Sequence, residues 1–174
     1  LGSSGVVAGA RGERIVTPRD WRGRGEEGRI GFHRDEVHDR LQTLWSALGT
    51  QSGAVFVPLC GKSLDMRWLV SAGHEVVGVE LSERAAREFF SEWGVKADRQ
   101  LRGSFIEFSG GGVRILVGDF FDLDQDLVGT VVAVYDRAAL VALDLPTRAR
   151  YVEHLFSLLR SDCRGLLITL EFPA

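Results

Sequence analysis

Cysteine and histidine are scarce in this chain of 174 residues, which has two cysteines and four histidines. Cys60 and Cys163 lie far apart in the sequence, so they form no disulfide framework, and the histidines lack the spacing of a zinc site. A chain of this length buries roughly two thirds of the surface that its unfolded form exposes. The sequence therefore excludes a small fold that depends on disulfides or a metal.

Long apolar runs and an excess of positive charge are also missing. No segment approaches the ~20 apolar residues of a membrane-spanning helix, and the first residues do not follow the pattern of a signal peptide. The net charge is −3, from 21 basic and 24 acidic side chains, so we expect no nucleic-acid or membrane partner. These absences predict a cytoplasmic protein with a small-molecule ligand. Because no apolar stripe is left over for an oligomer interface, we expect a monomer.

The chain divides into a short tail and one domain. Residues 1–14 are rich in glycine and serine and show no apolar periodicity, so they are predicted to be a flexible tail. Residues 15–174 have the length of a single domain. The first residue is leucine rather than methionine, which suggests a fragment or a processed form.

Short apolar runs alternate with amphipathic segments along the domain. Strands are predicted at 54–57, 75–80, 113–117, 130–135 and 165–170, with a hairpin strand at 105–108. Helices are predicted from residue 33 to a glycine cap at 49, from 63 to 72, from 82 to 93, and from 146 onward. The acidic segment 118–126 is predicted to be a loop. Alternating strands and helices predict an α/β fold with a mostly parallel, doubly wound sheet.

Candidate ligand-binding residues follow the predicted strands. In an open parallel sheet, ligands bind beyond the carboxyl ends of the strands, where the strand order switches. The residues at these positions are the segment 58–63, Glu80, Asp119 and the pair Asp136 and Arg137. We therefore expect the ligand site at this edge.

Three kinds of cofactor fit these positions to different degrees. Residues 61–63, GKS, are typical of the phosphate loop of a nucleotide hydrolase, but Phe56 stands where that loop needs a second glycine. A dinucleotide site needs more glycines after the first strand than this loop has. S-adenosyl-L-methionine has no pyrophosphate; Glu80 can accept hydrogen bonds from both of its ribose hydroxyls, and Asp119 can accept one from its adenine amino group. Taken singly, either carboxylate is equally typical of a solvated loop.

Two longer stretches carry a family resemblance. Residues 56–69, FVPLCGKSLDMRWL, and 73–82, GHEVVGVELS, closely resemble the thiopurine S-methyltransferase family, and its bacterial members are nearest. Segments 118–123 and 135–143 resemble two further motifs of that family. The spacing of its amino-terminal W, G and FH positions is matched by Trp21, Gly28, Phe32 and His33. The resemblance extends from about Thr17 to Glu171.

The resemblance implies a fold, a cofactor and an activity. The fold is the Rossmann-like class I methyltransferase fold, and the cofactor is S-adenosyl-L-methionine. The implied activity is transfer of a methyl group to the sulfur of an aromatic or heterocyclic thiol of the thiopurine type. In some bacterial members the acceptor is a selenium or tellurium species instead.

The resemblance also assigns roles to individual residues. Trp21 and Phe32 belong to an amino-terminal segment that folds over the cofactor, and Phe32 also borders the thiol. The other cofactor-binding residues are Leu59 at the methionine side, Glu80 at the ribose, Asp119 and Phe120 at the adenine end, and Arg137 at the sulfonium.

Arg137 is also the expected catalytic residue. Methyl transfer needs mainly the alignment of two sulfurs with the methyl group, and a cation near a thiol lowers its pKa. The alternative is a structural ion pair of Arg137 with Asp136 or Asp119. Cys60 has no paired base and is predicted to be a packing residue rather than a nucleophile. His33 is likewise predicted to be a packing or helix-start residue rather than a general base.

Two departures from the family pattern bear on this activity. Gly25 stands where the family usually carries a second tryptophan, which removes part of the expected aromatic cover over the cofactor. The family sequence continues beyond Ala174, so the sheet is expected to be truncated and to present an apolar edge at Leu166–Leu170. The alternative function is therefore a catalytically weak or inert S-adenosylmethionine-binding fragment, or an interaction domain.

Overall fold

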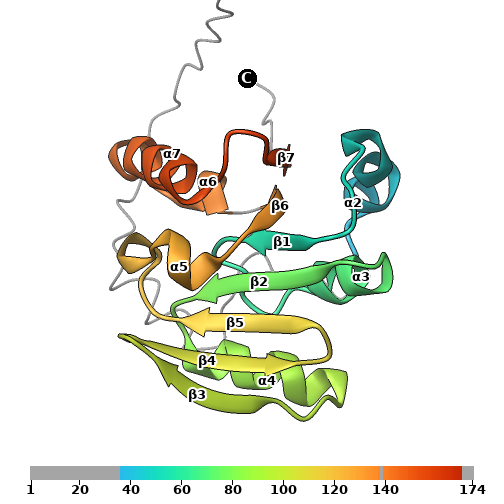
Figure 1. Cartoon of the computed structure of the whole chain (residues 1–174), viewed down its shortest axis with the longest axis vertical. Coiled ribbons are helices and arrows are strands. Elements are labelled where there is room, and N and C mark those ends of the chain that lie inside the picture. The colour runs from blue at the N-terminus through green and yellow to red at the C-terminus, as the bar shows by residue number, and fades with distance from the viewer. Residues whose placement is uncertain (1–35, 138, 170–174) are drawn as a thin grey trace, which may run out of the picture.

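One mixed sheet runs through the part of the chain that the computed structural model describes, residues 36–137 and 139–169. Its seven strands lie in the order β3-β4-β5-β2-β1-β6-β7 (Figure 1). The strands are β1 Ala54–Val57, β2 Glu75–Glu80, β3 Asp98–Arg102, β4 Phe105–Gly110, β5 Val113–Val117, β6 Val131–Asp136 and β7 Arg164–Leu167. The helices are α2 Asp39–Leu44, α3 Asp65–Ser71, α4 Glu83–Trp93, α5 Gln125–Val128, α6 Ala139–Ala142 and α7 Leu145–Leu158, with 3₁₀ turns η1 Trp45–Leu48 and η2 Phe120–Asp122.

Most neighbouring strands are parallel. The five strands β5, β2, β1, β6 and β7 run in the same direction. At the other edge, β4 is antiparallel to β5, and β3 is antiparallel to β4. Figure 1 shows the arrowheads of β2 and β5 on the same side of the sheet and the arrowhead of β4 on the opposite side. The predicted α/β fold with a mostly parallel sheet is therefore confirmed.

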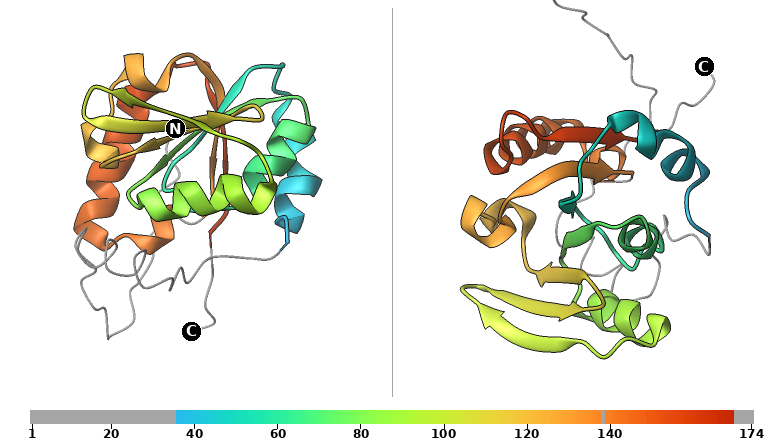
Figure 2. Two further views of the ribbon diagram at one scale, coloured as in Figure 1. Left: turned by 90° about the horizontal axis from the view of Figure 1, so that it is seen from below. Right: turned by 45° about the vertical axis from the view of Figure 1, so that its right-hand side comes forward.

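Helices cover both faces of this sheet (Figure 2). On one face, α2, α3 and α4 bury a core that includes Met66 and Phe89. On the other face, α5 and α7 bury a second core around Tyr151. Consecutive strand residues alternate between the two cores, as Val76 joins the first and Val77 the second. Since both faces of the sheet are covered, the fold is doubly wound as expected.

The apolar runs predicted the central elements closely. The strands β1, β2 and β5 have the predicted bounds, and α4 begins and ends where expected. Ser82 caps α4 by accepting a hydrogen bond from the amide of Ala85 at 3.3 Å, and Gly94 ends it in the left-handed conformation. The last strand, β7, ends at Leu167 rather than at the predicted Leu170, and residues 168 and 169 belong to no strand.

The leading helix departs from its predicted form. It begins at Asp39, and after Leu44 it tightens into the 3₁₀ turn η1. Leu41 and Trp45, four positions apart, are buried, so the buried stripe of this segment is narrower than predicted. Leu44, also predicted to be on the stripe, is 42% exposed, whereas Trp45 donates its indole N–H to Nε2 of His74 at 2.9 Å.

Four elements were not predicted from apolar periodicity. All five residues of β3 are exposed, and the strand is held by backbone pairing with β4. The segment 118–126, predicted to be a loop, contains η2 and the start of α5, whose first turns are capped by the side chains of Asp119 and Asp124. The short helix α6 was also missed. Hydrogen bonds rather than apolar periodicity determine these elements.

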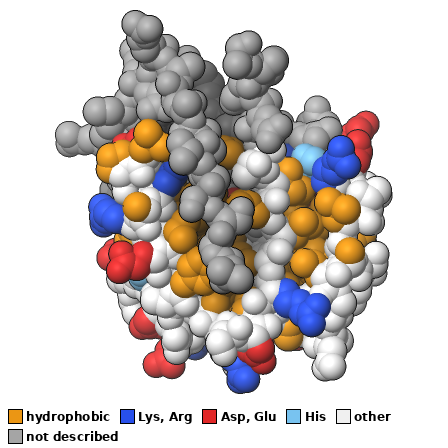
Figure 3. All heavy atoms as spheres, turned by 90° about the horizontal axis from the view of Figure 1, so that it is seen from above, with side chains coloured by type: hydrophobic (Ala, Val, Ile, Leu, Met, Phe, Trp, Pro, Cys, Tyr) orange, Lys and Arg blue, Asp and Glu red, His pale blue; other side chains and the backbone are white. Residues whose placement is uncertain are grey.

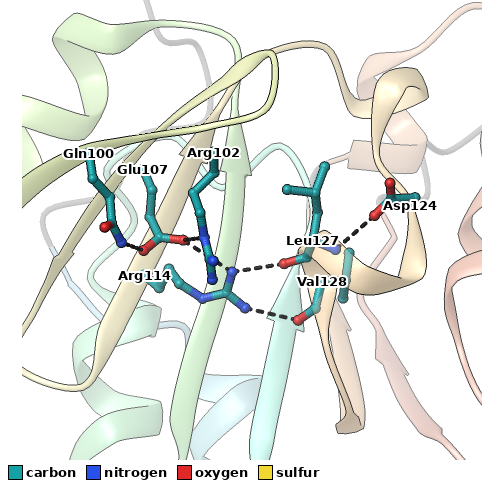
Figure 4. Close-up of polar contacts among 7 residues, drawn as sticks. All are labelled: Gln100, Arg102, Glu107, Arg114, Asp124, Leu127 and Val128. Carbon is teal, nitrogen blue, oxygen red and sulfur yellow. Dashed lines mark hydrogen bonds and ion pairs between the residues drawn. The ribbon is translucent and has the colours of Figure 1, made fainter.

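A buried carboxylate fixes the β3–β4 hairpin to the rest of the sheet. Glu107 on β4 is only 3% exposed, and it accepts hydrogen bonds from Gln100 and Arg102 on β3. Arg114 on β5 donates to Glu107 and to two backbone carbonyls at the end of α5 (Figure 4). Burial raises the pKa of Glu107, but these hydrogen bonds and the two arginine charges hold it below its usual range. The cluster therefore joins three strands and one helix through a single negative charge.

The opposite edge of the sheet is apolar. The strand β7 pairs with β6 and lies at the end of the strand order. On it Leu167 is 51% exposed, and on the neighbouring helix α7 Phe156 is 70% exposed. Figure 3 looks onto this side of the molecule and shows hydrophobic side chains gathered there. The exposed Leu167 agrees with the apolar edge expected from the sequence.

A glycine in the middle of β2 makes room for the loop after β1. A side-chain carbon on Gly78 would lie 2.7 Å from the sulfur of Cys60. We predict that Gly78→Ala lowers the free energy of unfolding by about 1–3 kcal/mol through overpacking, as measured by urea denaturation. The second change Cys60→Ala removes the sulfur, so the double variant is expected to recover most of the loss. A double variant less stable than Gly78→Ala alone would contradict this packing argument.

Candidate functional site

Backbone hydrogen bonds bring the carboxyl ends of three parallel strands together. The amide of Cys60, in the loop after β1, donates to the carbonyl of Val79 in β2 at 2.9 Å. The amide of Gly118, after β5, donates to the carbonyl of Glu80 at the end of β2 at 3.0 Å. The structure therefore places the loops after β1, β2 and β5 at one edge of the sheet, as the parallel topology predicted.

The loop after β1 turns sharply through two left-handed residues. Gly61 has a φ of +54°, and Leu59 has a φ of +48°, the single positive φ of a non-glycine residue in the described part of the chain. A bulky residue in this conformation costs about 1–3 kcal/mol and persists when its surroundings hold it there. Among the described residues, a side-chain carbon on Gly61 would meet no heavy atom within 4 Å. The backbone of the loop is therefore tightly specified, and the described residues leave space beside Gly61.

Glu80 holds this loop in place with its carboxylate. Its Oε2 accepts from the amide of Gly61 at 2.9 Å, and its Oε1 accepts from the amide of Ser82 at 2.8 Å. Burial raises the pKa of Glu80, while these backbone hydrogen bonds oppose the rise. Each carboxylate oxygen has two acceptor directions, so each is able to accept one further hydrogen bond.

Asp119 and Phe120 follow β5, but they face different surroundings. Asp119 caps η2 by accepting from the amide of Phe121 through Oδ1 at 3.0 Å, and its Oδ2 makes no hydrogen bond among the described residues. Phe120 is only 6% exposed, because its ring packs against Tyr151 and His154 at centroid distances of 4.8 and 5.1 Å. Asp119 therefore has one oxygen that can accept a hydrogen bond from a ligand, whereas Phe120 has little exposed ring surface for contact with one.

Arg137 follows β6 and is held by a buried acid. Its Nε lies 3.1 Å from Oδ2 of Asp65, and its Nη2 lies 3.5 Å from the hydroxyl of Ser63. Its side chain is 14% exposed. The ion pair with Asp65 differs from the alternative pairs that the sequence suggested, with Asp136 or Asp119. Arg137 is therefore fixed beside the loop after β1.

Asp136 has a structural role at the same strand end. It is 4% exposed, accepts from the amide of Ala139 through Oδ1, and accepts from the hydroxyl of Tyr151 through Oδ2 at 2.7 Å. Burial and the negative charge of Asp136 raise the pKa of Tyr151 above its usual range. These contacts cap α6 and connect it to α7.

Lys62 and Cys60 contribute packing and ion pairs to the loop after β1. The Lys62 amine lies 3.0 Å from Glu88 and 2.5 Å from Glu92, both on α4. It is therefore committed to α4, whereas a phosphate loop requires its lysine at the nucleotide. Cys60 is 6% exposed and its sulfur packs over Gly78, which agrees with the packing interpretation.

Several predicted positions lie outside the described residues. These are Trp21, Phe32, His33 and the departure at Gly25. Within residues 36–137 and 139–169, no group of three or more histidine, cysteine, aspartate or glutamate side chains is arranged to hold a metal ion. In the same ranges, no helix combines the length and apolar character of a membrane span.

Asp65 is the polar residue of this edge that the sequence analysis missed. It is 1% exposed and accepts from Arg137, from the hydroxyl of Tyr135 and from the amide of His38. A signal was present, because Asp65 precedes Leu69 by four positions on the buried face of a predicted helix. An acid in an apolar stripe needs buried partners.

Sequence comparison places the chain among methyltransferases. A family model described as thiopurine S-methyltransferase matches residues 16–174. A curated relative of that name from Pseudomonas putida (strain KT2440) is 47% identical over 158 residues, which are 90% of this chain and 73% of the relative. One from Xanthomonas campestris pv. campestris (strain 8004) is 46% identical over 88% of this chain and 71% of the relative. The chain thus spans about three quarters of the length of these relatives.

Solved structures support the same fold. A Burkholderia thailandensis 1,6-didemethyltoxoflavin-N1-methyltransferase with bound 1,6-didemethyltoxoflavin and S-adenosylhomocysteine matches with a TM-score of 0.60 and 21% identity. The match covers 86% of this chain and 59% of that chain. The glycopeptide N-methyltransferase MtfA in complex with sinefungin matches with a TM-score of 0.57 and 17% identity, over 74% of this chain and 51% of that one. The predicted class I methyltransferase fold is confirmed.

The chemical reactivity of Cys60 tests its packing role. Burial raises the pKa of this thiol well above its usual range, and the negative charge of Glu80 raises it further. In a Cys163→Ser background, we predict that iodoacetamide labels Cys60 at least about tenfold more slowly in the native chain than in urea, because the thiolate is rare and inaccessible. Mass spectrometry follows the labelling. Equal rates in both states would contradict a buried, unactivated thiol.

Proposed function

The chain belongs to the thiopurine S-methyltransferase family, and from this premise we propose that it transfers a methyl group from S-adenosyl-L-methionine to the sulfur of an aromatic or heterocyclic thiol. The family uses S-adenosyl-L-methionine. The acceptor is supported by the family description and by the names of the curated relatives. The assignment of individual residues rests on the geometry of the strand ends.

The observation that carries the cofactor site is the position of Glu80. Its carboxylate lies at the end of β2, both oxygens already accept backbone hydrogen bonds, and both retain a second acceptor direction. The described residues leave space beside the neighbouring Gly61. The two ribose hydroxyls of the cofactor can donate one hydrogen bond to each carboxylate oxygen. Adjacent ribose hydroxyls bind a carboxylate in this bidentate way at dinucleotide sites.

The other described residues fit the remaining parts of the cofactor. Oδ2 of Asp119 is available to accept from the adenine amino group. Leu59, in its left-handed turn, is available to line the methionine side of the site. Phe120 makes a smaller contribution than the sequence suggested, because most of its ring is covered by Tyr151 and His154.

The chemistry requires alignment more than covalent catalysis. The bound cofactor supplies a methyl group on a positively charged sulfur, which is a good leaving group. The substrate thiol loses its proton to solvent, its sulfur forms a bond to the methyl carbon as the methyl–sulfonium bond breaks, and the products are a thioether and S-adenosylhomocysteine. The protein therefore contributes mainly by holding both partners in line.

Arg137 is the cation best placed to act on the acceptor. It follows β6 and lies beside the loop after β1, where Ser63 contacts its Nη2. A positive charge near a thiol favours the thiolate, which is the nucleophilic form. Asp65 neutralises part of that charge, so the position of the guanidinium matters as well as its charge.

Binding of the product analogue tests the cofactor site independently of the substrate. We predict that Glu80→Ala weakens binding of S-adenosylhomocysteine by about 1.5–3 kcal/mol, the usual loss for a charge-assisted hydrogen bond. Titration calorimetry measures the change. Glu75→Ala is the matched control, since Glu75 is an exposed glutamate at the opposite end of the same strand. Equal affinities for Glu80→Ala and the original chain would remove Glu80 from the site.

The same binding is expected to depend on pH. Ribose hydroxyls donate to the carboxylate form of Glu80, so affinity falls as Glu80 becomes protonated. Because burial raises the pKa of Glu80, the fall begins at a higher pH than it would for an exposed glutamate. Cys60, the titratable neighbour, stays neutral because its own pKa is raised. Calorimetry in buffers from neutral to acidic pH measures how the affinity for S-adenosylhomocysteine changes with pH. Glu80→Gln is expected to abolish this pH dependence.

Turnover with thiols tests the proposed acceptor. Incubation with S-adenosyl-L-methionine and thiophenol is expected to yield methyl phenyl sulfide, detected by mass spectrometry, and phenol in place of thiophenol is expected to yield no methyl ether. Binding of S-adenosylhomocysteine without methylation of any aromatic thiol would instead favour an inert cofactor-binding chain. Methylation of selenite or tellurite alone would favour the metalloid alternative.

A further inference from the structure

A buried carboxylate connects three segments at the proposed active edge. Asp65, the first residue of α3, is 1% exposed. Its Oδ1 accepts from the backbone amide of His38 at 2.8 Å, and its Oδ2 accepts from the hydroxyl of Tyr135 at 2.9 Å. The same Oδ2 lies 3.1 Å from Nε of Arg137. Asp65 thus contacts the start of α2, the end of β6 and the residue after β6.

Stability alone does not require a charged residue at the position of Asp65. A buried charge without partners is strongly unfavourable, and an apolar residue of similar size is often as stable as a buried pair. Here both oxygens of one carboxylate are satisfied by residues far apart in sequence. The arrangement fixes orientation, because Nε and the Ser63 contact at Nη2 together hold the plane of the Arg137 guanidinium.

We propose that Asp65 is a positioning residue for methyl transfer, which orients Arg137 toward the acceptor and ties that orientation to the chain entering at His38. This inference rests on the proposed function, in which Arg137 acts on the thiol. Asp65 itself is not expected to touch the cofactor or the substrate. It acts through the guanidinium that it holds.

Positioning and electrostatics predict opposite effects of removing the charge. The negative charge of Asp65 weakens the positive potential that Arg137 presents. If Arg137 acted through its charge alone, Asp65→Asn would speed the reaction by exposing the full positive charge to the thiol. If Asp65 acts by orienting Arg137, the same variant slows the reaction, because Asn has one acceptor oxygen in place of two, and its NH₂ group then faces either the amide of His38 or Nε of Arg137.

Steady-state kinetics with thiophenol separate the two effects. We expect Asp65→Asn to lower kcat by about ten- to a hundredfold, as a misplaced catalytic group does, with KM for S-adenosyl-L-methionine changed by less than about threefold. Asp162→Asn is the matched control, because it removes an exposed partner of Arg160 by the same chemical change. An unchanged or raised kcat in Asp65→Asn would overturn the proposal.

A double-mutant cycle with Arg137→Lys tests whether Asp65 works through Arg137. Lysine keeps the positive charge but has no Nε to be oriented. In the Arg137→Lys background, Asp65→Asn is therefore expected to lower kcat by less than about twofold further, since the two changes remove one function. If the double variant instead lowers kcat by the product of the two separate factors, Asp65 has a purely structural role and the proposal is overturned. If Asp65→Asn does not fold by circular dichroism, Asp65→Glu, which keeps the charge but displaces it, takes its place in the cycle.

A spectroscopic measurement keeps the inference separate from the proposed function. In the ¹⁵N-labelled chain, the Nε–H signal of Arg137, assigned by its loss in Arg137→Lys, is expected to exchange slowly with water. Asp65→Asn is expected to speed that exchange by at least about tenfold, and Tyr135→Phe by less than about threefold, since only the first removes the ionic partner. Slow exchange in Asp65→Asn would overturn the positioning role. A chain that shows these exchange rates but methylates no thiol would support the orientation of Arg137 by Asp65 and count against the proposed acceptor.

Discussion

The hydrogen bond between the amide of Gly61 and the carboxylate of Glu80 is the contact on which the proposed site depends. It ties the loop after β1 to the end of β2 at a distance of 2.9 Å. The loop reaches this contact only because Leu59 and Gly61 both adopt left-handed conformations. The glutamate that fixes the loop is also the residue proposed to hold the ribose. Loop conformation and cofactor binding are therefore coupled through one carboxylate.

Buried charge has a comparable organising role on both faces of the sheet. On the face covered by α2, α3 and α4, Asp65 joins Arg137 and Tyr135 to the chain at His38. On the face covered by α5 and α7, Glu107 joins the β3–β4 hairpin to β5 through Arg114 (Figure 4). Apolar contacts have no preferred direction and tolerate small shifts of a segment. A buried carboxylate with several hydrogen-bond donors allows few arrangements of the segments around it. The two clusters thus set the register of segments that the apolar cores alone would leave adjustable.

The sequence was sufficient to predict the elements with strong apolar patterns. The strands β1, β2 and β5 and the helix α4 followed directly from short apolar runs, a serine cap and a glycine stop. Apolar patterns did not predict the elements that other interactions determine. The exposed strand β3 is held by backbone pairing with β4, and the continuous helix predicted up to Gly49 changes to a 3₁₀ turn at Trp45. At the site, position after a strand predicted Glu80 and Asp119, but only the folded chain shows that Asp65 is the partner of Arg137.

The antiparallel hairpin and the proposed active edge also differ in the chain length that each must close. The strands β3, β4 and β5 are consecutive within residues 98–117, so their contacts are local and cost little loop entropy. The contact between Tyr135 and Asp65 spans 70 positions, and the pairing of β1 with β6 is similarly remote in sequence. The proposed active edge therefore has a higher contact order than the hairpin, and chain entropy opposes its assembly more strongly. A ligand that bridges these strand ends in the native state alone stabilises the whole fold through the part that is entropically hardest to assemble.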